Sequence, residues 1–344
     1  MTNASPPLDY QHIDFLQPGS ADVMFLNCSP MVKPAKGQIL IKVAVAGVNG
    51  PDVAQRKGVY PAPKDASPIL GLEVAGEVCG LGDEVTQWQL GDKVTALVPG
   101  GGYGEFVVTY AEHCLPIPQG WTLEEAAAIP ETFFTVWGNL FMRAGLTAGE
   151  TVLIHGGSGG IGSAAIVLAK AFGARVIATS GSDEKCEYCL GLGADLALNY
   201  QQDFVVPVME HTQGQGVDVV FDIAGGDFIN QNLKALAIDG RMVSVAMQRG
   251  PKAQVDIFRL MAKRITWTGS TLRPQSIEAK SSIACELLEK VWPLLNKAAD
   301  DRTHRLVPNI FARFPLSECV SAHLLMESGA HRGKIVLSIE RSNV

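Results

Sequence analysis

The run His155-Gly156-Gly157-Ser158-Gly159-Gly160-Ile161-Gly162 contains the spacing G-x-G-x-x-G at Gly157, Gly159 and Gly162. In such a run the first glycine permits a tight turn, and the second lets the backbone approach a pyrophosphate. The third lets a helix pack closely on a strand. An apolar strand is predicted before the run and a helix of small and apolar residues after it, so its N–H groups and helix dipole would attract phosphate. We predict a dinucleotide site, rather than a flexible glycine-rich loop, at Gly157, Ser158, Gly159, Gly160, Ile161 and Gly162.

The residues after the next predicted strand indicate which dinucleotide binds. A fold specific for NAD usually has an acidic residue there, which holds the ribose hydroxyls. This chain has Thr179-Ser180-Gly181-Ser182 instead, with Lys185 one turn into the following helix. Hydroxyls and an ammonium would bind a 2′-phosphate, which a carboxylate would repel. NADPH is therefore favoured over NADH, and we interpret the nearby Asp183 and Glu184 as first-turn acids that complement the helix dipole.

Cysteines and histidines show no pattern typical of a metal site. The one C-x-x-C is Cys186-Glu187-Tyr188-Cys189, and a zinc site would need two further ligands nearby, whereas a redox disulfide would need a thioredoxin context. We interpret the pair as ordinary helix cysteines. His155 is assigned to packing or turn hydrogen bonding rather than catalysis, because no partner residue is evident. The sequence predicts no metal.

The elements around these residues indicate two domains. Short β-branched runs at 39–45, 74–78 and 106–108, separated by Gly and Pro, predict a barrel-like β domain. The pattern becomes helical over 123–144. From Thr151 onward, short apolar strands alternate with helices, as in a parallel doubly wound sheet. A last strand at 333–339 is expected to return to the first domain, which gives domains of 1–130, completed by 305–344, and 131–304.

Composition limits the possible partners. The 344 residues are 47% hydrophobic and 18% charged, with a formal net charge of −7, so no basic face for nucleic acid is expected. The first residues lack the features of a signal peptide, and no apolar stretch is long enough to cross a bilayer. Seven scattered cysteines fit reduced thiols. We expect a cytoplasmic protein with neither nucleic-acid nor membrane partners.

Several longer segments resemble the zinc-independent quinone oxidoreductases, a family that includes zeta-crystallin, and especially its stress-inducible branch. The resemblance covers nearly the whole chain from about Ile39. It rests on Val45-Ala46-Gly47-Val48-Asn49, Gln55-Arg56-Lys57-Gly58-Val59-Tyr60, Ile69-Leu70-Gly71-Leu72-Glu73-Val74-Ala75-Gly76, Leu90-Gly91-Asp92-Lys93-Val94, Ala126-Ala127-Ala128-Ile129-Pro130-Glu131, the glycine run and Gly269-Ser270-Thr271-Leu272-Arg273. It implies a GroES-like β-rich domain plus a Rossmann domain, the medium-chain dehydrogenase/reductase architecture, with the active site in the cleft between them.

The resemblance also implies roles for single residues. Asn49 and Tyr60 match polar residues near the nicotinamide and the substrate, whereas Lys185 and Tyr200 match the pair that holds the adenosine 2′-phosphate. Further cofactor contacts are expected at Thr135, Ala246, Met247, Ser270, Leu272 and Arg273. Zinc-containing relatives would need a cysteine where Asn49 stands and a histidine where Leu72 stands, and these two residues cannot form a catalytic zinc site. The family also implies a homodimer or homotetramer, paired through an edge strand near 238–245 and 265–268.

Without a metal or an activated nucleophile, we expect direct hydride transfer from NADPH to a quinone or another electron-poor carbonyl. Tyr60 would donate a hydrogen bond to the developing oxyanion, with Asn49 as a second donor; alternatively, Tyr60 is a loop aromatic that only packs on the cleft wall. Two other functions stay open. One is an alkenal or enoyl-thioester reductase with the same fold, since a fold does not determine a reaction. The other is a non-catalytic NADPH-binding partner protein.

Overall fold

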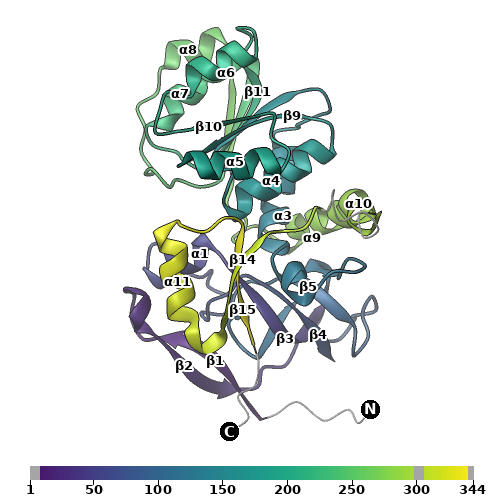
Figure 1. The fold of residues 1–344 in the computed structure, drawn as a ribbon. Coiled ribbons are helices and arrows are strands. Elements are labelled where there is room, and N and C mark those ends of the chain that lie inside the picture. Colours follow the sequence, from purple (N-terminus) through teal and green to yellow (C-terminus); the bar gives the residue numbers. More distant parts are fainter. Residues whose placement is uncertain (1–7, 298–305, 340–344) are drawn as a thin grey trace. The chain divides into compact units, whose positions relative to one another are not determined.

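The computed structural model describes residues 8–297 and 306–339, and the chain forms two compact units. Unit 1 contains residues 1–131 and 273–344, and unit 2 contains residues 132–272 (Figure 1). The sequence placed the return to the first domain at 305, a residue outside those described, whereas the structure places it at Arg273. Hydrogen bonds explain the difference: His113 Nε2 pairs with the Ile277 carbonyl, and Trp292 Nε1 donates to the Pro116 carbonyl. The helices after Arg273 therefore belong to unit 1.

Unit 1 is built around a seven-stranded sheet with the order β14-β15-β3-β4-β5-β7, in which β6 pairs with β3. All pairs are antiparallel except β14 with β15. A separate antiparallel pair, β1 with β2, precedes the sheet. The strands are β1 Asp9–Phe15, β2 Met24–Pro30, β3 Gln38–Val48, β4 Glu73–Leu81, β5 Lys93–Leu97, β6 Phe106–Tyr110, β7 Cys114–Pro116, β14 Ile310–Pro315 and β15 Lys334–Ser338.

The helices of unit 1 are short, and its last strand, β15, lies in the same sheet as the strands of the first domain, as the sequence predicted. β15 pairs with β3 in the register Leu337 to Ala46, which joins the two ends of the chain in one sheet. The helices are α1 Gly50–Arg56, α2 Leu123–Ala127, α9 Ile277–Glu286, α10 Trp292–Lys297 and α11 Cys319–Ser328, with 3₁₀ turns at Ala21–Val23, Ala111–His113 and Leu316–Glu318 and a π-helical turn at Leu287–Val291.

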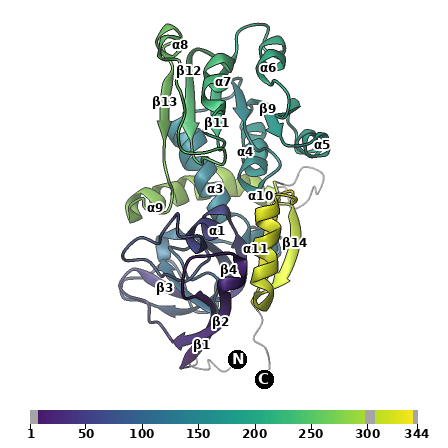
Figure 2. The ribbon, with the colours of Figure 1, turned by 90° about the vertical axis from the view of Figure 1, so that its left-hand side faces the viewer.

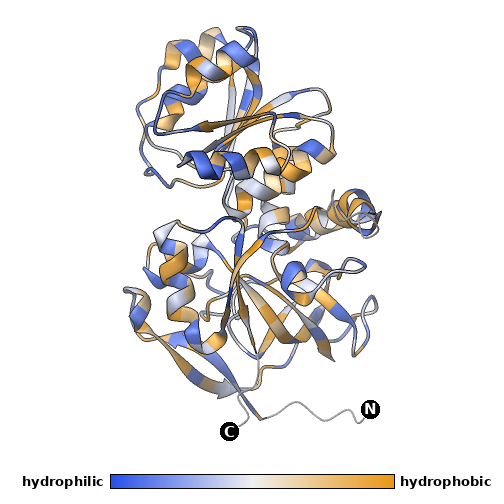
Figure 3. Ribbon diagram, viewed as in Figure 1, coloured by the Kyte–Doolittle hydropathy of each residue, from blue (hydrophilic) through white to orange (hydrophobic). Residues whose placement is uncertain are grey.

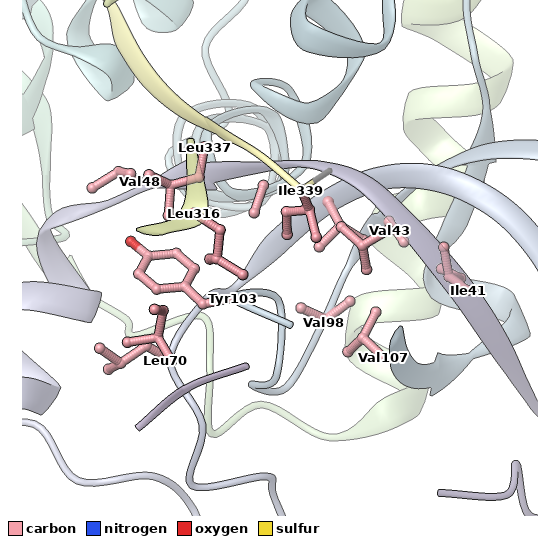
Figure 4. Close-up of a cluster of buried hydrophobic side chains, with 14 of the residues drawn as sticks. Ile41, Val43, Val48, Leu70, Val98, Tyr103, Val107, Leu316, Leu337 and Ile339 are labelled. Carbon is pink, nitrogen blue, oxygen red and sulfur yellow. The ribbon is translucent and has the colours of Figure 1, made fainter. Parts of the chain in front are cut away.

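The core of unit 1 comes from alternate residues of these strands. Ile39, Ile41 and Val43 of β3 are buried, because successive side chains of a strand point to opposite faces and one face here is apolar. They meet side chains from β5, β6, α11, β15 and the 3₁₀ turn Leu316–Glu318, including Leu316 and Leu337 (Figure 4). Each such buried aliphatic side chain contributes about 1.5 to 3 kcal/mol through removal from water. Figure 3 shows hydrophobic residues along the strands and mixed polarity on the helices.

Unit 2 contains a six-stranded parallel sheet with the order β10-β9-β8-β11-β12-β13. Its strands are β8 Thr151–Ile154, β9 Arg175–Ser180, β10 Leu196–Asn199, β11 Val217–Asp222, β12 Leu236–Ser244 and β13 Thr266–Gly269. Its helices are α4 Gly160–Ala171, α5 Asp183–Gly191, α6 Val205–His211, α7 Phe228–Ala235 and α8 Ile257–Ala262, together with most of α3 Pro130–Val136 and a π-helical turn at Trp137–Arg143.

The strand order reverses direction at β8, which has later strands on both sides. Because parallel connections are right-handed, helices that link β8 to β9 and β9 to β10 cover one face, and those that follow β10 cover the other. This gives α4 and α5 on one face and α6, α7 and α8 on the other (Figures 1 and 2). The point of reversal is where an open α/β sheet binds its ligand.

Two details differ from the sequence prediction. The helical stretch expected at 123–144 is broken, because Pro130 cannot continue α2 and instead begins α3. After α3 the chain widens into a π-helical turn, where Trp137 stacks on Phe141 and both rings contact Phe172. Of the two segments expected to form a sheet edge, β12 is internal and only β13 is terminal.

Within the described ranges, no helix is long and apolar enough to span a membrane.

Candidate functional site

The glycine run forms a tight turn between β8 and α4. Gly156 adopts a left-handed conformation, with φ of 63°, so the turn depends on this residue rather than on Gly157. The Gly157 N–H donates to the Thr179 carbonyl at 2.9 Å, and the Gly159 N–H donates to the Gly156 carbonyl at 3.0 Å. Gly159 is then the N-cap of α4. The turn is thus fixed by its own backbone and by β9.

The three glycines of the G-x-G-x-x-G run differ in what a side chain at each position would meet. A Cβ at Gly162 would lie 2.1 Å from the Gly156 carbonyl oxygen, and one at Gly157 would lie 2.9 Å from Cys189 Sγ. A Cβ at Gly159 would meet nothing nearer than 3.6 Å, so this face of the turn is open. The first-turn N–H groups of a helix have no intrahelical acceptor. The turn therefore fits the pyrophosphate of a dinucleotide, with Ser158 and residues 159–162 around it.

The residues expected at the adenosine end lie beside this turn. Ser180 ends β9 and is buried. A Cβ at Gly181 would lie 2.7 Å from the Tyr200 hydroxyl, so this glycine leaves room for Tyr200. Lys185 lies half-buried on α5, and its backbone N–H is capped by Ser182 Oγ at 3.3 Å. Asp183 accepts a hydrogen bond from Asn199 Nδ2 at 2.8 Å. The sheet order places β9 and β10 side by side, which brings these residues together.

A second hydrogen-bonded set links distant segments of unit 2. The Thr135 carbonyl accepts from Asn139 Nδ2 at 2.9 Å, and Asn139 Oδ1 accepts from Ser270 Oγ at 2.6 Å. Two residues predicted as cofactor contacts, Thr135 and Ser270, are thus joined through Asn139, which the sequence reading missed. Ala246 and Met247 lie in an exposed loop after β12. Leu272 is buried and is the last residue of unit 2.

His155 and the cysteine pair occupy the interior of unit 2. His155 Nδ1 pairs with Thr179 Oγ1 at 2.8 Å and Nε2 with Asn232 Oδ1 at 2.7 Å, and burial lowers the pKa of this imidazole. The ring packs between Phe204 and Phe228. His155 is therefore a packing residue, as the sequence indicated. Cys186 and Cys189 lie buried on α5, and burial raises both thiol pKa values, which opposes thiolate formation.

Asp222 at the end of β11 was not singled out from the sequence. Its carboxylate is fully buried and accepts from the N–H groups of Ala224 and Gly225 and from Ser244 Oγ, all at 3.0 Å. It therefore fixes the loop that follows β11, next to the glycine turn in the sheet order. An acidic residue at the end of the apolar run Val219-Val220-Phe221 was the signal that could have identified it.

Unit 1 contains a buried polar cluster formed by Asn49, Glu73 and Lys334. Lys334 Nζ lies 2.6 Å from Glu73 Oε1 and 2.5 Å from Asn49 Oδ1, and Asn49 Nδ2 donates to Glu73 Oε1 at 2.8 Å. The Lys334 and Glu73 side chains are 3% and 0% exposed. The ammonium therefore fixes which way the Asn49 amide points. The second Nδ2 hydrogen is directed to the Gly47 carbonyl at 3.5 Å, a long contact, so both amide hydrogens of Asn49 have acceptors within the domain.

The two other residues expected near the substrate or the cofactor also lie in unit 1. Tyr60 is half-buried in the turn after α1, where its N–H donates to the Ala54 carbonyl at 3.2 Å. Arg273 is buried, with Nη1 on Gln55 Oε1 at 2.6 Å and Nε on the Pro99 carbonyl at 3.0 Å. Burial lowers the pKa of Arg273, and the charges of Asp52, Tyr60 and Glu131 oppose this. Arg273 thus lies within electrostatic reach of Tyr60.

Two family models match the chain. One is described as the alcohol dehydrogenase GroES-like domain and matches residues 35–119, and the other is described as zinc-binding dehydrogenase and matches residues 160–288. Among curated proteins, the chain is 33% identical over 325 residues to a phenolphthiocerol/phthiocerol polyketide synthase of Mycobacterium tuberculosis. This match covers 94% of the chain but 14% of that relative, so the chain spans a small part of its length.

Solved structures agree over the whole fold. The JamJ enoyl reductase superposes with a TM-score of 0.84 at 26% identity, covering 96% of this chain and 99% of that one. Escherichia coli quinone oxidoreductase complexed with NADPH gives 0.80 at 27% identity, with 96% and 100% covered. The chain has the architecture of a medium-chain dehydrogenase/reductase. Unit 1 is its GroES-like domain, and unit 2 is its Rossmann domain.

One of these family models is named for zinc, but the residues of the GroES-like domain do not fit a zinc ion. Leu72 is aliphatic and buried, and the Asn49 oxygen already accepts from the Lys334 ammonium. A divalent cation beside Asn49 would lie against that positive charge. Within residues 8–297 and 306–339, no group of three or more His, Cys, Asp or Glu side chains is placed to hold a metal. No step of the chemistry is therefore assigned to zinc.

Two buried carboxyl groups accompany the cluster. Asp52 accepts from the N–H groups of Asn49 and Gly71 at 2.8 and 3.0 Å, and burial raises its pKa to about 6. Glu131 stands where the chain enters the Rossmann domain, and its N–H donates to Glu73 Oε2 at 2.9 Å. Burial, together with the charges of Glu73 and Asp52, raises the pKa of Glu131 to about 8. Glu131 therefore keeps its proton at neutral pH.

We predict that Lys334→Met lowers the free energy of unfolding by roughly 3 to 5 kcal/mol, because it leaves the Glu73 carboxylate buried without a counter-charge. Urea unfolding followed by far-UV circular dichroism measures this. The double variant Lys334→Met/Glu73→Gln is expected to recover more than half of the loss. Lys36→Met is the control, since Lys36 and Glu84 form an exposed pair whose loss costs at most about 1 kcal/mol. Equal effects of Lys334→Met and Lys36→Met would contradict the role of the pair.

We predict that Glu131→Gln changes the pH dependence of stability. Folding raises the Glu131 pKa to about 8, so between the ordinary carboxyl pKa and pH 8 only the unfolded chain releases this proton. Stability of the wild type then falls as pH rises through this window, by up to about 1.4 kcal/mol per pH unit. Glu131→Gln removes this pH-dependent contribution. The stability of the variant relative to the wild type should therefore rise from pH 5 to pH 8.5. Urea midpoints at three pH values test this, with the exposed Glu77→Gln as control; a constant difference would refute it.

Proposed function

We propose that the protein is an NADPH-dependent reductase that transfers hydride to a conjugated carbonyl compound, in the first instance a quinone. The observation that carries the proposal is the acid-free end of β9, where Ser180, Gly181 and Tyr200 lie beside the glycine turn. Lys185 follows on α5. Hydroxyls and an ammonium at this position favour a 2′-phosphate over a plain ribose. The resemblance to zinc-independent quinone oxidoreductases supports the quinone as acceptor.

When bound, NADPH supplies the hydride, and the protein contributes orientation and electrostatics. The N–H groups of residues 160–162 bind the pyrophosphate, and Lys185 with Tyr200 holds the 2′-phosphate. In the GroES-like domain, Tyr60 donates a hydrogen bond to the acceptor oxygen as that oxygen gains negative charge. Asn49 Nδ2, whose direction Lys334 and Glu73 fix, is the second donor, and it exchanges its long 3.5 Å contact with the Gly47 carbonyl for the acceptor oxygen.

A second candidate is an enoyl reductase, which adds the hydride to a C=C bond conjugated with a thioester carbonyl. The comparisons favour it specifically, because the matched relatives are polyketide synthases and the similar structures include JamJ and CurK enoyl reductases. The two reactions need the same donors, because both place negative charge on a conjugated carbonyl oxygen. A third possibility, a protein that binds NADPH without turnover, predicts silence with every acceptor.

We predict that the chelator-treated protein oxidises NADPH faster than NADH with an ortho-quinone, a para-quinone, an enone or an enoyl thioester. Absorbance at 340 nm measures this. Turnover of quinones identifies a quinone reductase, turnover of the enone and thioester alone identifies the enoyl reductase, and NADPH binding without turnover would overturn both proposals. Tyr60→Phe is expected to lower kcat by about tenfold or more, since a donor to an oxyanion is lost. Tyr110→Phe, in the same domain, is the control.

We also propose that a second copy of this chain is a partner. β13 is the terminal strand of the Rossmann sheet, so one of its edges has no partner within residues 8–297 and 306–339. Trp267 of β13 is exposed, and so are Phe258 and Met261 of α8, the helix that precedes β13 in the chain and has no buried residue. An unpaired strand edge flanked by apolar residues is suited to pairing with an identical edge across a two-fold axis.

We predict that light scattering after size exclusion gives a dimer, or a tetramer built from such dimers, for the wild type. The double variant Phe258→Glu/Met261→Lys should convert a dimer to a monomer, or a tetramer to a dimer, because charges would be buried in the contact. Val206→Glu on α6 is the control, since Val206 is a similarly exposed apolar residue of the same domain. A wild-type monomer, or a variant with unchanged mass, would contradict this proposal.

A further inference from the structure

Arg249 lies at the same edge of the Rossmann sheet as the glycine turn. The strands β9, β8 and β11 are parallel neighbours, so the loops after their carboxyl ends meet at one edge. The loop that carries Arg249 is bound to the loop after β11: the Arg249 N–H donates to the Ala224 carbonyl at 2.8 Å and the Gln248 N–H to the Ile223 carbonyl at 3.2 Å. Arg249 is therefore fixed beside the region where an adenosine would lie.

Two neighbouring side chains, Asp227 and Phe228, fix the orientation of the Arg249 guanidinium. Asp227 binds it in a bidentate manner, with Nε to Oδ1 at 2.5 Å and Nη2 to Oδ2 at 2.7 Å. Its Cζ atom lies 4.7 Å from the centre of the Phe228 ring. A guanidinium fixed by a carboxylate and an aromatic ring loses little further freedom when a planar ligand stacks on it. The Arg249 side chain is still 42% exposed, so part of it is accessible.

Phe228 connects Arg249 to the predicted adenosine residues. The Phe228 ring makes an edge contact with Tyr200, at 5.8 Å between ring centres. Tyr200 in turn lies against Gly181 at the end of β9. Asp227 first, and Tyr200 to a smaller extent, raise the pKa of Arg249, so the arginine lies within electrostatic reach of Tyr200. Gly181, Tyr200, the buried Phe228 ring and Arg249 thus form a continuous series of contacts along this edge.

We propose that Arg249 is the platform on which the adenine ring of the dinucleotide stacks. This rests on the proposed function, since it takes a nicotinamide dinucleotide as the ligand of the glycine turn. The Asp227 carboxylate cancels the net charge of the guanidinium, which makes the pair suited to a neutral aromatic base rather than to the 2′-phosphate. Lys185 and Tyr200 are left for the phosphate. Arg249 thus contributes affinity for the adenine that NADPH and NADH share, and Lys185 contributes the preference between them.

The test is direct binding to the full chain, measured by calorimetry with NADPH, NADH and adenosine 2′,5′-bisphosphate, without any acceptor. Arg249→Met is expected to weaken NADPH and NADH equally, by about tenfold, because a stacking surface is lost. Arg249→Lys should be nearly as weak, since it keeps the charge but not the plane. Lys185→Met should weaken only NADPH and the bisphosphate. The control is Arg264→Met, because Arg264 forms a matching exposed pair with Asp239 at 2.6 and 2.7 Å in the same domain.

Each binding result either supports or overturns the stacking role of Arg249. Unchanged affinity in Arg249→Met, or wild-type affinity in Arg249→Lys, would overturn the stacking role while leaving the proposed function intact. A loss confined to NADPH would assign Arg249 to the phosphate instead and would also overturn it. A wild type that binds no dinucleotide would overturn the proposed function, and this inference with it. Thermal unfolding of every variant checks that a loss of binding does not come from misfolding.

Discussion

The buried pair of Glu73 and Lys334 is the contact on which the GroES-like domain depends most. It joins four segments that are far apart in the sequence: β4, β15, the residue before α1 and the start of α3. A carboxylate and an ammonium removed from water are tolerated only when their hydrogen bonds are satisfied, and here Asn49 and the Glu131 N–H complete the set. The pair therefore restricts which residues can occupy the positions around it.

Gly47 occupies one of these restricted positions. A Cβ at this position would lie 2.0 Å from Glu73 Oε1, so β3 must have a glycine where the carboxylate crosses it. Position 71 also requires glycine. Its φ is 97°, and a Cβ there would lie 2.5 Å from the Tyr103 backbone nitrogen. The Gly71 N–H in turn donates to the Asp52 carboxylate. The glycines of the β domain thus mark where polar side chains and backbone pass close together. The ammonium of Lys334 orients the Asn49 amide in this arrangement.

The Rossmann domain depends instead on close approach of backbone to backbone. Gly162 lets α4 begin directly against the turn, and Gly157 lets the turn lie over Cys189 and Ala178. Asp222 and His155 then hold the neighbouring strand ends through buried hydrogen bonds. The result is one rigid edge with open N–H groups in the middle and polar side chains at both ends.

The sequence alone determined the two-domain architecture, the order of strands and helices around the glycine turn, and the absence of an acid after β9. These follow from local patterns, because alternation of apolar residues and the position of glycines act over a few residues. Tertiary structure decided what depends on residues distant in the chain. It assigned Arg273 and the helices after it to the GroES-like domain, and it made Gly156, not Gly157, the left-handed residue of the turn. It also paired Lys334 with Asn49, 285 residues apart, and brought Arg249 over Phe228, because a contact between side chains from separate elements leaves no periodic trace in the sequence.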